Sequence, residues 1–161
     1  MSITVIEMGA GDLPDVLAIQ ARCYDAAKHE SAAVFQAKLD AAPGCSFVAR
    51  RGATTLGYLV AVPALMGLPP PLHGEDCPLP PAPDCLYLHD MAVAPEARGS
   101  GSARALVAAF LAQQRRLGFA HAALTAVNGA SGYWERLGFT ARDAVGLDSY
   151  GDGAVYMTRQ E

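Results

Sequence analysis

Residues 93–106 read VAPEARGSGSARAL: an apolar run stops at Pro95, an arginine follows, and then five small residues come in a row. The small residues, Gly99 to Ala103, lead directly into a helix-forming segment at 104–117. The first turn of a helix leaves backbone N–H groups unpaired at the positive end of the helix dipole, and such a place binds anions. Glycines let a phosphate approach the backbone closely, and Arg98 adds a cation. We therefore expect a phosphate or pyrophosphate site here, although a tight turn chosen only for its dihedral angles would use the same residues.

Two common phosphate-binding motifs do not fit this stretch. A P-loop requires G-x-x-x-x-G-K-[ST], and the lysine is missing. A dinucleotide-binding fingerprint requires a third glycine where Arg104 stands.

The elements on either side predict an α/β fold with a mixed sheet. Apolar alternation and helical spacing indicate the following order: a strand at 3–8, helices at 13–24 and 31–41, a hairpin at 45–51 and 55–62, a strand at 86–93, a helix at 104–117, a strand at 122–127, a short helix at 131–137, and strands at 140–147 and 154–159 around a turn at 150–153. The proline-rich segment 66–84 cannot form a helix or a central strand. Loops of this length are often functional lids or substrate walls.

Size and composition narrow the class of protein. The 161 residues suit one domain, 1–161, and 52% hydrophobic with 17% charged residues indicate a packed globular chain. A net charge of −4 without any Lys/Arg cluster argues against nucleic-acid binding. Without a signal peptide or a membrane-spanning run, we expect a cytoplasmic protein that does not bind membranes. The four cysteines form no C-x-x-C pair, so we expect no metal and reduced, mostly buried thiols, with a Cys77–Cys85 disulfide as the alternative.

Two segments resemble the GNAT superfamily of acyl-CoA-dependent acetyltransferases. The family's pyrophosphate loop, [QR]-x-x-G-x-[GA], is matched by Arg98, Gly101 and Ala103. The segment LYLHDMAVAPEARGSGSARALVAAFL, 86–111, is similar to its fourth strand and third helix, and GYWERLGF, 132–139, is similar to its F-Y-E-K-L-G-F element. The resemblance implies a central mixed, mostly antiparallel sheet with splayed strands four and five, flanked by about four helices. It also allows a homodimer, since dimers are common in the family.

The resemblance implies an N-acetyltransferase that uses acetyl-CoA as co-substrate. A free amine of a small molecule or peptide would attack the thioester directly. Backbone groups at the end of the fourth strand would bind pantetheine and stabilise the oxyanion, and the glycine-rich loop would hold the pyrophosphate. The implied cofactor-binding residues are Met91, Ala92, Val93, Arg98, Gly99, Ser100, Gly101, Ser102, Ala103, Asn128 and Trp134. Asn128 could instead cap the following helix.

The catalytic residues are less directly matched. The family often uses a tyrosine of F-Y-E-K-L-G-F to protonate the departing thiolate, but that position is Trp134 here, and Tyr133 lies one residue earlier. We take Tyr133 as the candidate acid, with plain packing as the alternative. For the base we take Asp90, with His89 second; strand alternation predicts that only one of the two faces the substrate.

The acceptor side is predicted from the segment between the first two helices. The resemblance implies that Tyr24 and Glu30 line the acceptor pocket, where an acidic Glu30/Asp90 pair would suit a cationic amine. Lys28 is expected to be solvated. His73, Glu75 and Asp76 in the proline-rich loop are further candidates. Because Trp134 replaces the usual tyrosine, a catalytically silent acyl-CoA sensor is the alternative function.

Overall fold

The computed structural model describes residues 2–72, 74 and 76–161, so the candidates His73 and Glu75 lie outside it. The described residues form one seven-stranded sheet in the order β1-β2-β3-β4-β5-β7-β6. The strands are β1 (Thr4–Glu7), β2 (Phe47–Arg51), β3 (Thr54–Ala64), β4 (Cys85–Val93), β5 (His121–Ala126), β6 (Thr140–Ala141) and β7 (Val155–Gln160). Only β4 and β5 pair in parallel, which confirms the predicted mixed, mostly antiparallel sheet.

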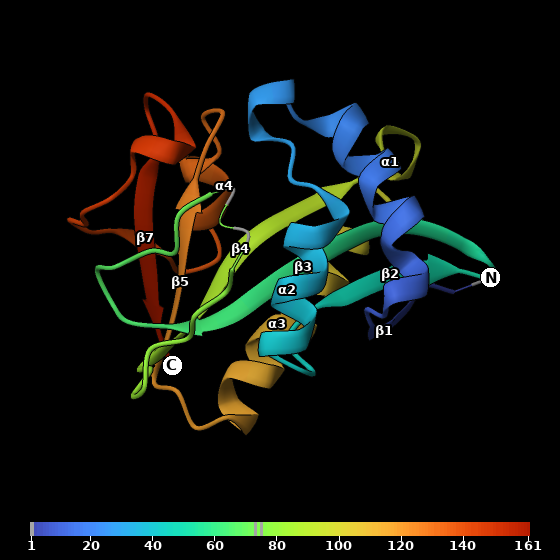
Figure 1. The fold of residues 1–161 in the computed structure, drawn as a ribbon. Helices are drawn as coiled ribbons and strands as arrows, with labels where there is room; N and C mark the ends of the chain where they lie inside the picture. Colours follow the sequence, from blue (N-terminus) through green and yellow to red (C-terminus); the bar gives the residue numbers. More distant parts are fainter. Residues whose placement is uncertain (1, 73, 75) are drawn as a thin grey trace.

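Four α-helices cover the two faces of this sheet (Figure 1). They are α1 (Leu13–Cys23), α2 (Ala32–Ala41), α3 (Ser102–Arg116) and α4 (Ser131–Glu135), with 3-10 turns η1 (Ala10–Asp12), η2 (Ala26–Lys28), η3 (Pro95–Ala97) and η4 (Asp148–Tyr150). On one face, α1 and α2 bury Val16, Ile19 and Phe35 against Tyr58 and Val60 of β3.

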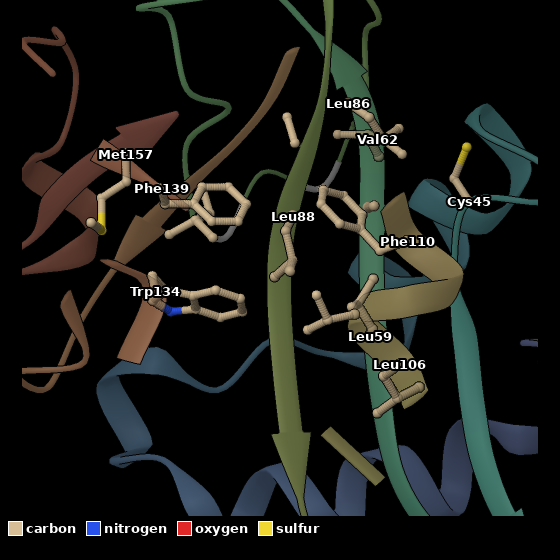
Figure 2. Packing of buried hydrophobic residues seen from close by; sticks show 14 of the residues in the cluster. Cys45, Leu59, Val62, Leu86, Leu88, Leu106, Phe110, Trp134, Phe139 and Met157 are labelled. Carbon is tan, nitrogen blue, oxygen red and sulfur yellow. The ribbon is translucent and has the colours of Figure 1, made fainter. Parts of the chain in front are cut away.

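On the other face, α3 and α4 pack into a separate cluster. Leu106 and Phe110 of α3 contact Leu59 and the β4 residue Leu88, as Figure 2 shows. Trp134 of α4 lies in the same cluster with Phe139 and Met157. The helices therefore leave β4 at the centre of the molecule, with apolar packing on both sides.

The two central strands separate at one end. β4 pairs with β5 only from Cys85↔His121 to Leu88↔Leu124, although β4 continues to Val93. Figure 1 shows the two strands close together near the C-terminus and diverging toward the opposite end. This divergence confirms the expectation of splayed fourth and fifth strands.

The C-terminal segment differs from the prediction. The strand expected at 140–147 is only two residues long, Thr140–Ala141, and the expected turn at 150–153 begins with Tyr150 buried at the end of η4. The chain between them leaves the sheet because it packs against the proline-rich loop instead, where the Val145 N–H donates to the Gly67 carbonyl. A non-local contact has replaced strand pairing here.

Three simpler features complete the description. All four cysteines are free thiols, so the Cys77–Cys85 disulfide does not form. Within the described ranges, no helix is both long and apolar enough to cross a membrane. Those ranges also contain no group of three or more His, Cys, Asp or Glu side chains that could hold a metal ion.

Candidate functional site

A cavity of about 300 Å³ lies where β4 and β5 diverge, and it receives side chains from both faces of the sheet. The ends of both strands line it, from Leu88 to Val93 and from Leu124 to Asn128. On the α3/α4 side its walls are Arg98, Ala130, Tyr133 and Trp134; on the α1 side they are Cys23, Tyr24, Lys28, Leu72 and Tyr150. A ligand in this cavity would therefore lie between the strands and be reachable from either face.

The glycine-rich loop borders a second, adjoining hollow, which is lined by residues 97–104, Val93 and Tyr133. Gly99 and Gly101 have φ of 80° and 92°, a conformation that favours glycine, and α3 starts directly after Gly101 without a side-chain cap. The Ser102 N–H donates to Ser100 Oγ at 3.3 Å, but helix geometry leaves the N–H groups of Ala103 and Arg104 without a carbonyl partner. A methyl group built on Gly99 or Gly101 would meet nothing within 4 Å, so this face of the loop is open.

The end of β4 directs backbone groups into the gap. The Ala94 N–H donates to the β3-side carbonyl of Leu56, so by alternation the N–H and C=O groups of Met91 and Val93 point away from β3. The Met91 carbonyl accepts from the Tyr24 hydroxyl at 2.6 Å, and the Val93 carbonyl from the Cys23 thiol at 3.3 Å. Their N–H groups face a region where β5 has already separated from β4.

Asp90 is a partly buried carboxyl at the wall of the cavity. Its Oδ2 accepts a hydrogen bond from the Tyr58 hydroxyl at 2.8 Å. Burial raises the pKa of Asp90 to about 7, although the Tyr58 hydrogen bond opposes this shift. Burial and the nearby Asp90 charge raise the pKa of Tyr24 and of Tyr58 well above the usual value, so both stay neutral hydrogen-bond donors.

A β-bulge changes how His89 and Asp90 are presented, and the expectation of opposite faces was wrong. Val60 pairs with Asp90 while Ala61 pairs with Leu88, so His89 is an extra residue in the ladder. Both residues therefore border the same cavity. The His89 side chain, however, is 0% exposed, so it reaches a ligand only through its neighbours.

Glu30 lies behind His89 instead of lining the cavity, contrary to its predicted place in the acceptor pocket. Its Oε2 is 3.4 Å from His89 Nε2 and 3.4 Å from Lys38 Nζ, in a cluster where all three side chains are at most 5% exposed. The Gln20 side chain holds the Glu30 backbone through two hydrogen bonds of 2.8 and 2.9 Å. Lys28, expected to be solvated, is instead half-buried and lines the cavity.

Tyr133 and Trp134, two aromatic residues that follow β5, differ in their burial. Tyr133 is half-buried and borders both the cavity and the adjoining hollow. Trp134 is buried against Phe139 at a ring separation of 5.6 Å and forms part of the core. Asn128 is exposed at the cavity with φ 55°; it does not cap α4, whose N-cap is Ala130.

Three residues of this site were missed by sequence reasoning. Tyr58 lies within an apolar strand, pairs with Ala92 in the β3–β4 register, and reaches Asp90 two residues away through its hydroxyl. Tyr150 and Leu72 form the far wall, where the Tyr150 hydroxyl donates to the Pro70 carbonyl at 2.5 Å and the Leu72 N–H donates to Ser149 Oγ at 2.8 Å. No local pattern links these distant segments.

Comparisons with known proteins agree with this fold. The model of the acetyltransferase (GNAT) family matches residues 13–139. Ard1 from Thermoplasma volcanium is 18% identical, covers 99% of this chain and 98% of its own, and superposes with a TM-score of 0.76. The fold is shared with the ribosomal-protein-S18-alanine N-acetyltransferase from Escherichia coli, which is 19% identical; the match covers 98% of this chain and 93% of that chain, with a TM-score of 0.69. It is also shared with a GNAT family acetyltransferase from Brucella melitensis in complex with acetyl-CoA, which is 21% identical; that match covers 98% of this chain and 87% of the other, with a TM-score of 0.65. No curated protein matches the sequence.

Proposed function

The chain belongs to the acetyltransferase (GNAT) family, and from this premise we propose that it transfers the acetyl group of acetyl-CoA to a primary amine of a small molecule or peptide. The observation that carries the proposal is the cavity between β4 and β5. It adjoins an open, positively charged helix entrance on one side and a carboxyl group of raised pKa on the other. Both halves of a two-substrate transfer can meet in this arrangement.

The residues present fit acetyl-CoA, which supplies the acetyl group as a reactive thioester. The open N–H groups at the start of α3, together with Arg98, would hold the diphosphate. The N–H groups of Met91 and Val93 would bind carbonyl oxygens along the gap, and one of them would stabilise the oxyanion that forms as the amine attacks. A structure of the Brucella melitensis relative contains this ligand, which supports the assignment.

Asp90 would remove the proton from the acceptor ammonium group before attack. A carboxyl group with a pKa of about 7 is partly ionised near neutral pH and is therefore a competent base. An α-ammonium group with a pKa near 8 would transfer its proton to Asp90 at a cost of roughly 1.4 kcal/mol. Tyr58 would orient the Asp90 carboxylate by donating to Oδ2.

Tyr133 would donate a proton to the departing thiolate. Its position between the cavity and the hollow beside the glycine-rich loop supports this role, whereas Trp134, which also lines the cavity, is buried in the core and does not reach that hollow. The specific observation behind the alternative, a silent acyl-CoA sensor, is the tryptophan at the family's usual tyrosine position. The location of Tyr133 favours the enzyme.

Two measurements on the purified protein test the proposal. Calorimetry should detect CoA binding, and a panel of amines should include some that release free CoA and gain an acetyl group by mass spectrometry. Absence of CoA binding would contradict both the enzyme and the sensor. Binding of acetyl-CoA without transfer to any amine would favour the sensor.

A further inference from the structure

We propose that the acceptor amine carries a carboxylate group, which the ammonium group of Lys28 binds at the α1-side wall of the cavity. The inference rests on the proposed transferase function and adds the substrate class.

The position of Lys28 is the first observation. It is the last residue of η2, it is half-buried, and it lines the cavity together with Tyr24, Leu72 and Tyr150. Its Nζ lies close to the backbone of Gly151, since a methyl group built there would be 3.9 Å away. The ammonium group thus lies beside the residue that follows η4.

The pairing of charges is the second observation. Lys38, the other lysine, is already bound to Glu30, whereas the ion pairs found among the described residues do not include Lys28. The Glu30 carboxylate, which would have attracted a cationic substrate, is turned toward His89 and Lys38 outside the cavity. Apart from Asp90, the charged side chain among the described residues that lines the acceptor side of the cavity is therefore Lys28.

The charges of Asp90 and Lys28 together favour an acceptor that carries both an ammonium group and a negative group. Arg98 also lines the cavity, but on the α3/α4 side, next to the glycine-rich loop. On the acceptor side, Asp90 would take the ammonium end of a substrate and Lys28 its carboxylate. A second positive charge on the acceptor would face Lys28 and be repelled, because like charges in a partly desolvated site interact strongly. The acceptor is then an amino acid or an acidic peptide N-terminus, and not a polyamine.

Matched pairs of acceptors test this inference. One arm compares alanine with alaninamide and 4-aminobutyrate with 4-aminobutyramide; the other compares C-terminally amidated tetrapeptides that differ only in Glu, Gln or Lys at the second position. We expect kcat/KM to be about fivefold higher for the carboxylate member of at least one arm, as for a half-buried ion pair, and the difference to shrink at high salt. The arm that shows the preference distinguishes a small molecule from a peptide.

Variants of Lys28 connect the preference to this residue. Lys28→Met should abolish it, Lys28→Arg should keep it and Lys28→Glu should reverse it, all with an unchanged KM for acetyl-CoA. The control is Arg51→Met, which removes the same charge at the exposed end of β2, outside both cavities, and should change nothing.

The inference is overturned if acids and amides react equally in both arms, if the preference survives in Lys28→Met, or if that variant weakens acetyl-CoA binding instead. In these cases the transferase function itself stands, because acetyl transfer is still observed. Absence of transfer to every amine by a protein that binds CoA would remove the proposed function and this inference together.

Discussion

At the scale of single residues, the site places a carboxyl group where its charged form is unfavourable. Asp90 is partly desolvated, and the negative charge of Glu30 raises its pKa further, while only hydrogen bonds from tyrosines and the more distant Lys38 oppose the shift. A group with these surroundings holds its proton to near-neutral pH and destabilises the folded state when it ionises. The proposed reaction therefore requires ionised Asp90, whereas the folded state is more stable when Asp90 is protonated.

Replacing Asp90 with Asn should separate the effect of this residue on catalysis from its effect on stability. We expect Asp90→Asn to lower kcat/KM by about 10²-fold or more, because the base is lost. The wild-type kcat/KM should rise tenfold per pH unit below about 7 and level off between 7 and the pKa of the amine, above which the ammonium form is lost; the variant should lack the inflection near 7. Initial rates with a fixed amine between pH 5 and 9 measure both effects.

The same variant should be more stable than the wild type at alkaline pH. The pKa of Asp90 rises from 3.8 when unfolded to about 7 when folded, so the unfolded chain loses its proton first. The contribution of Asp90 to wild-type stability should then fall as pH rises through 4 to 7, so Asp90→Asn should gain on the order of 2 kcal/mol relative to the wild type at pH 8 and nothing below pH 4. Urea unfolding at the two pH values checks this sign; a variant that is less stable at pH 8 would contradict it.

Tyr133 and Trp134 offer a second residue-scale contrast. Tyr133→Phe removes only a hydroxyl, so kcat should fall at least tenfold if this group protonates the thiolate, with little change in melting temperature. Trp134→Phe shrinks a buried side chain and should cost about 1–2 kcal/mol of stability with a smaller effect on kcat. An unchanged kcat for Tyr133→Phe would contradict the role of proton donor and leave Tyr133 with a packing role only.

At the scale of elements, the site depends on two departures from regular structure. β4 carries a bulge at His89 and then leaves β5, and α3 begins from a glycine with positive φ instead of a capping side chain. Both departures expose backbone groups that a regular sheet or a capped helix would satisfy internally. The backbone itself thus becomes the binding surface.

Two glycines at opposite ends of α3 allow this idea to be tested. Gly101 and Gly118 have φ of 92° and 79°, and a methyl group on either would meet nothing within 4 Å. Alanine at each position should therefore cost a similar 1–2 kcal/mol through strain alone. Only Gly101→Ala should also raise the dissociation constant of CoA, by about tenfold, because its methyl group enters the hollow beside the loop. Calorimetry of the two variants checks this; equal CoA affinities would contradict it.

The same elements show what a sequence can reveal. The glycine-rich loop, the strand before it and most element bounds were predictable, because small residues, apolar runs and prolines act locally. The bulge was not, since adjacent polar residues in a strand do not show which one is extra; it is defined by pairing with Val60 and Ala61. The Glu30–His89 contact spans 59 positions, so no local pattern could reveal that Glu30 is withdrawn from the cavity.

At the scale of the whole molecule, the acceptor wall is assembled from three segments that are far apart in the chain. The α1–α2 connection supplies Tyr24 and Lys28, the proline-rich loop supplies Leu72, and the C-terminal segment supplies Tyr150. Hydrogen bonds join the last two, and Tyr87 links Tyr150 to Thr125 at the end of β5. The proline-rich loop and the C-terminal segment should therefore move as a unit.

Two tyrosines bind the proline-rich loop through hydrogen bonds. Comparing variants of the two distinguishes how the loop is attached from what it does at the cavity. The Tyr150 hydroxyl donates to the Pro70 carbonyl, and the Gly67 N–H donates to the Tyr156 hydroxyl at 2.8 Å, but only Tyr150 lines the cavity. Tyr150→Phe and Tyr156→Phe should each cost about 1–2 kcal/mol of stability and speed amide hydrogen exchange at residues 66–68 and 72, because each leaves a loop group unpaired. Only Tyr150→Phe should raise the KM of the acceptor, several-fold, while the KM of acetyl-CoA stays constant in both. If Tyr156→Phe raised the acceptor KM equally, the loop as a whole and not the wall at Tyr150 would control access; if neither variant did, the proline-rich segment would lie outside the acceptor site.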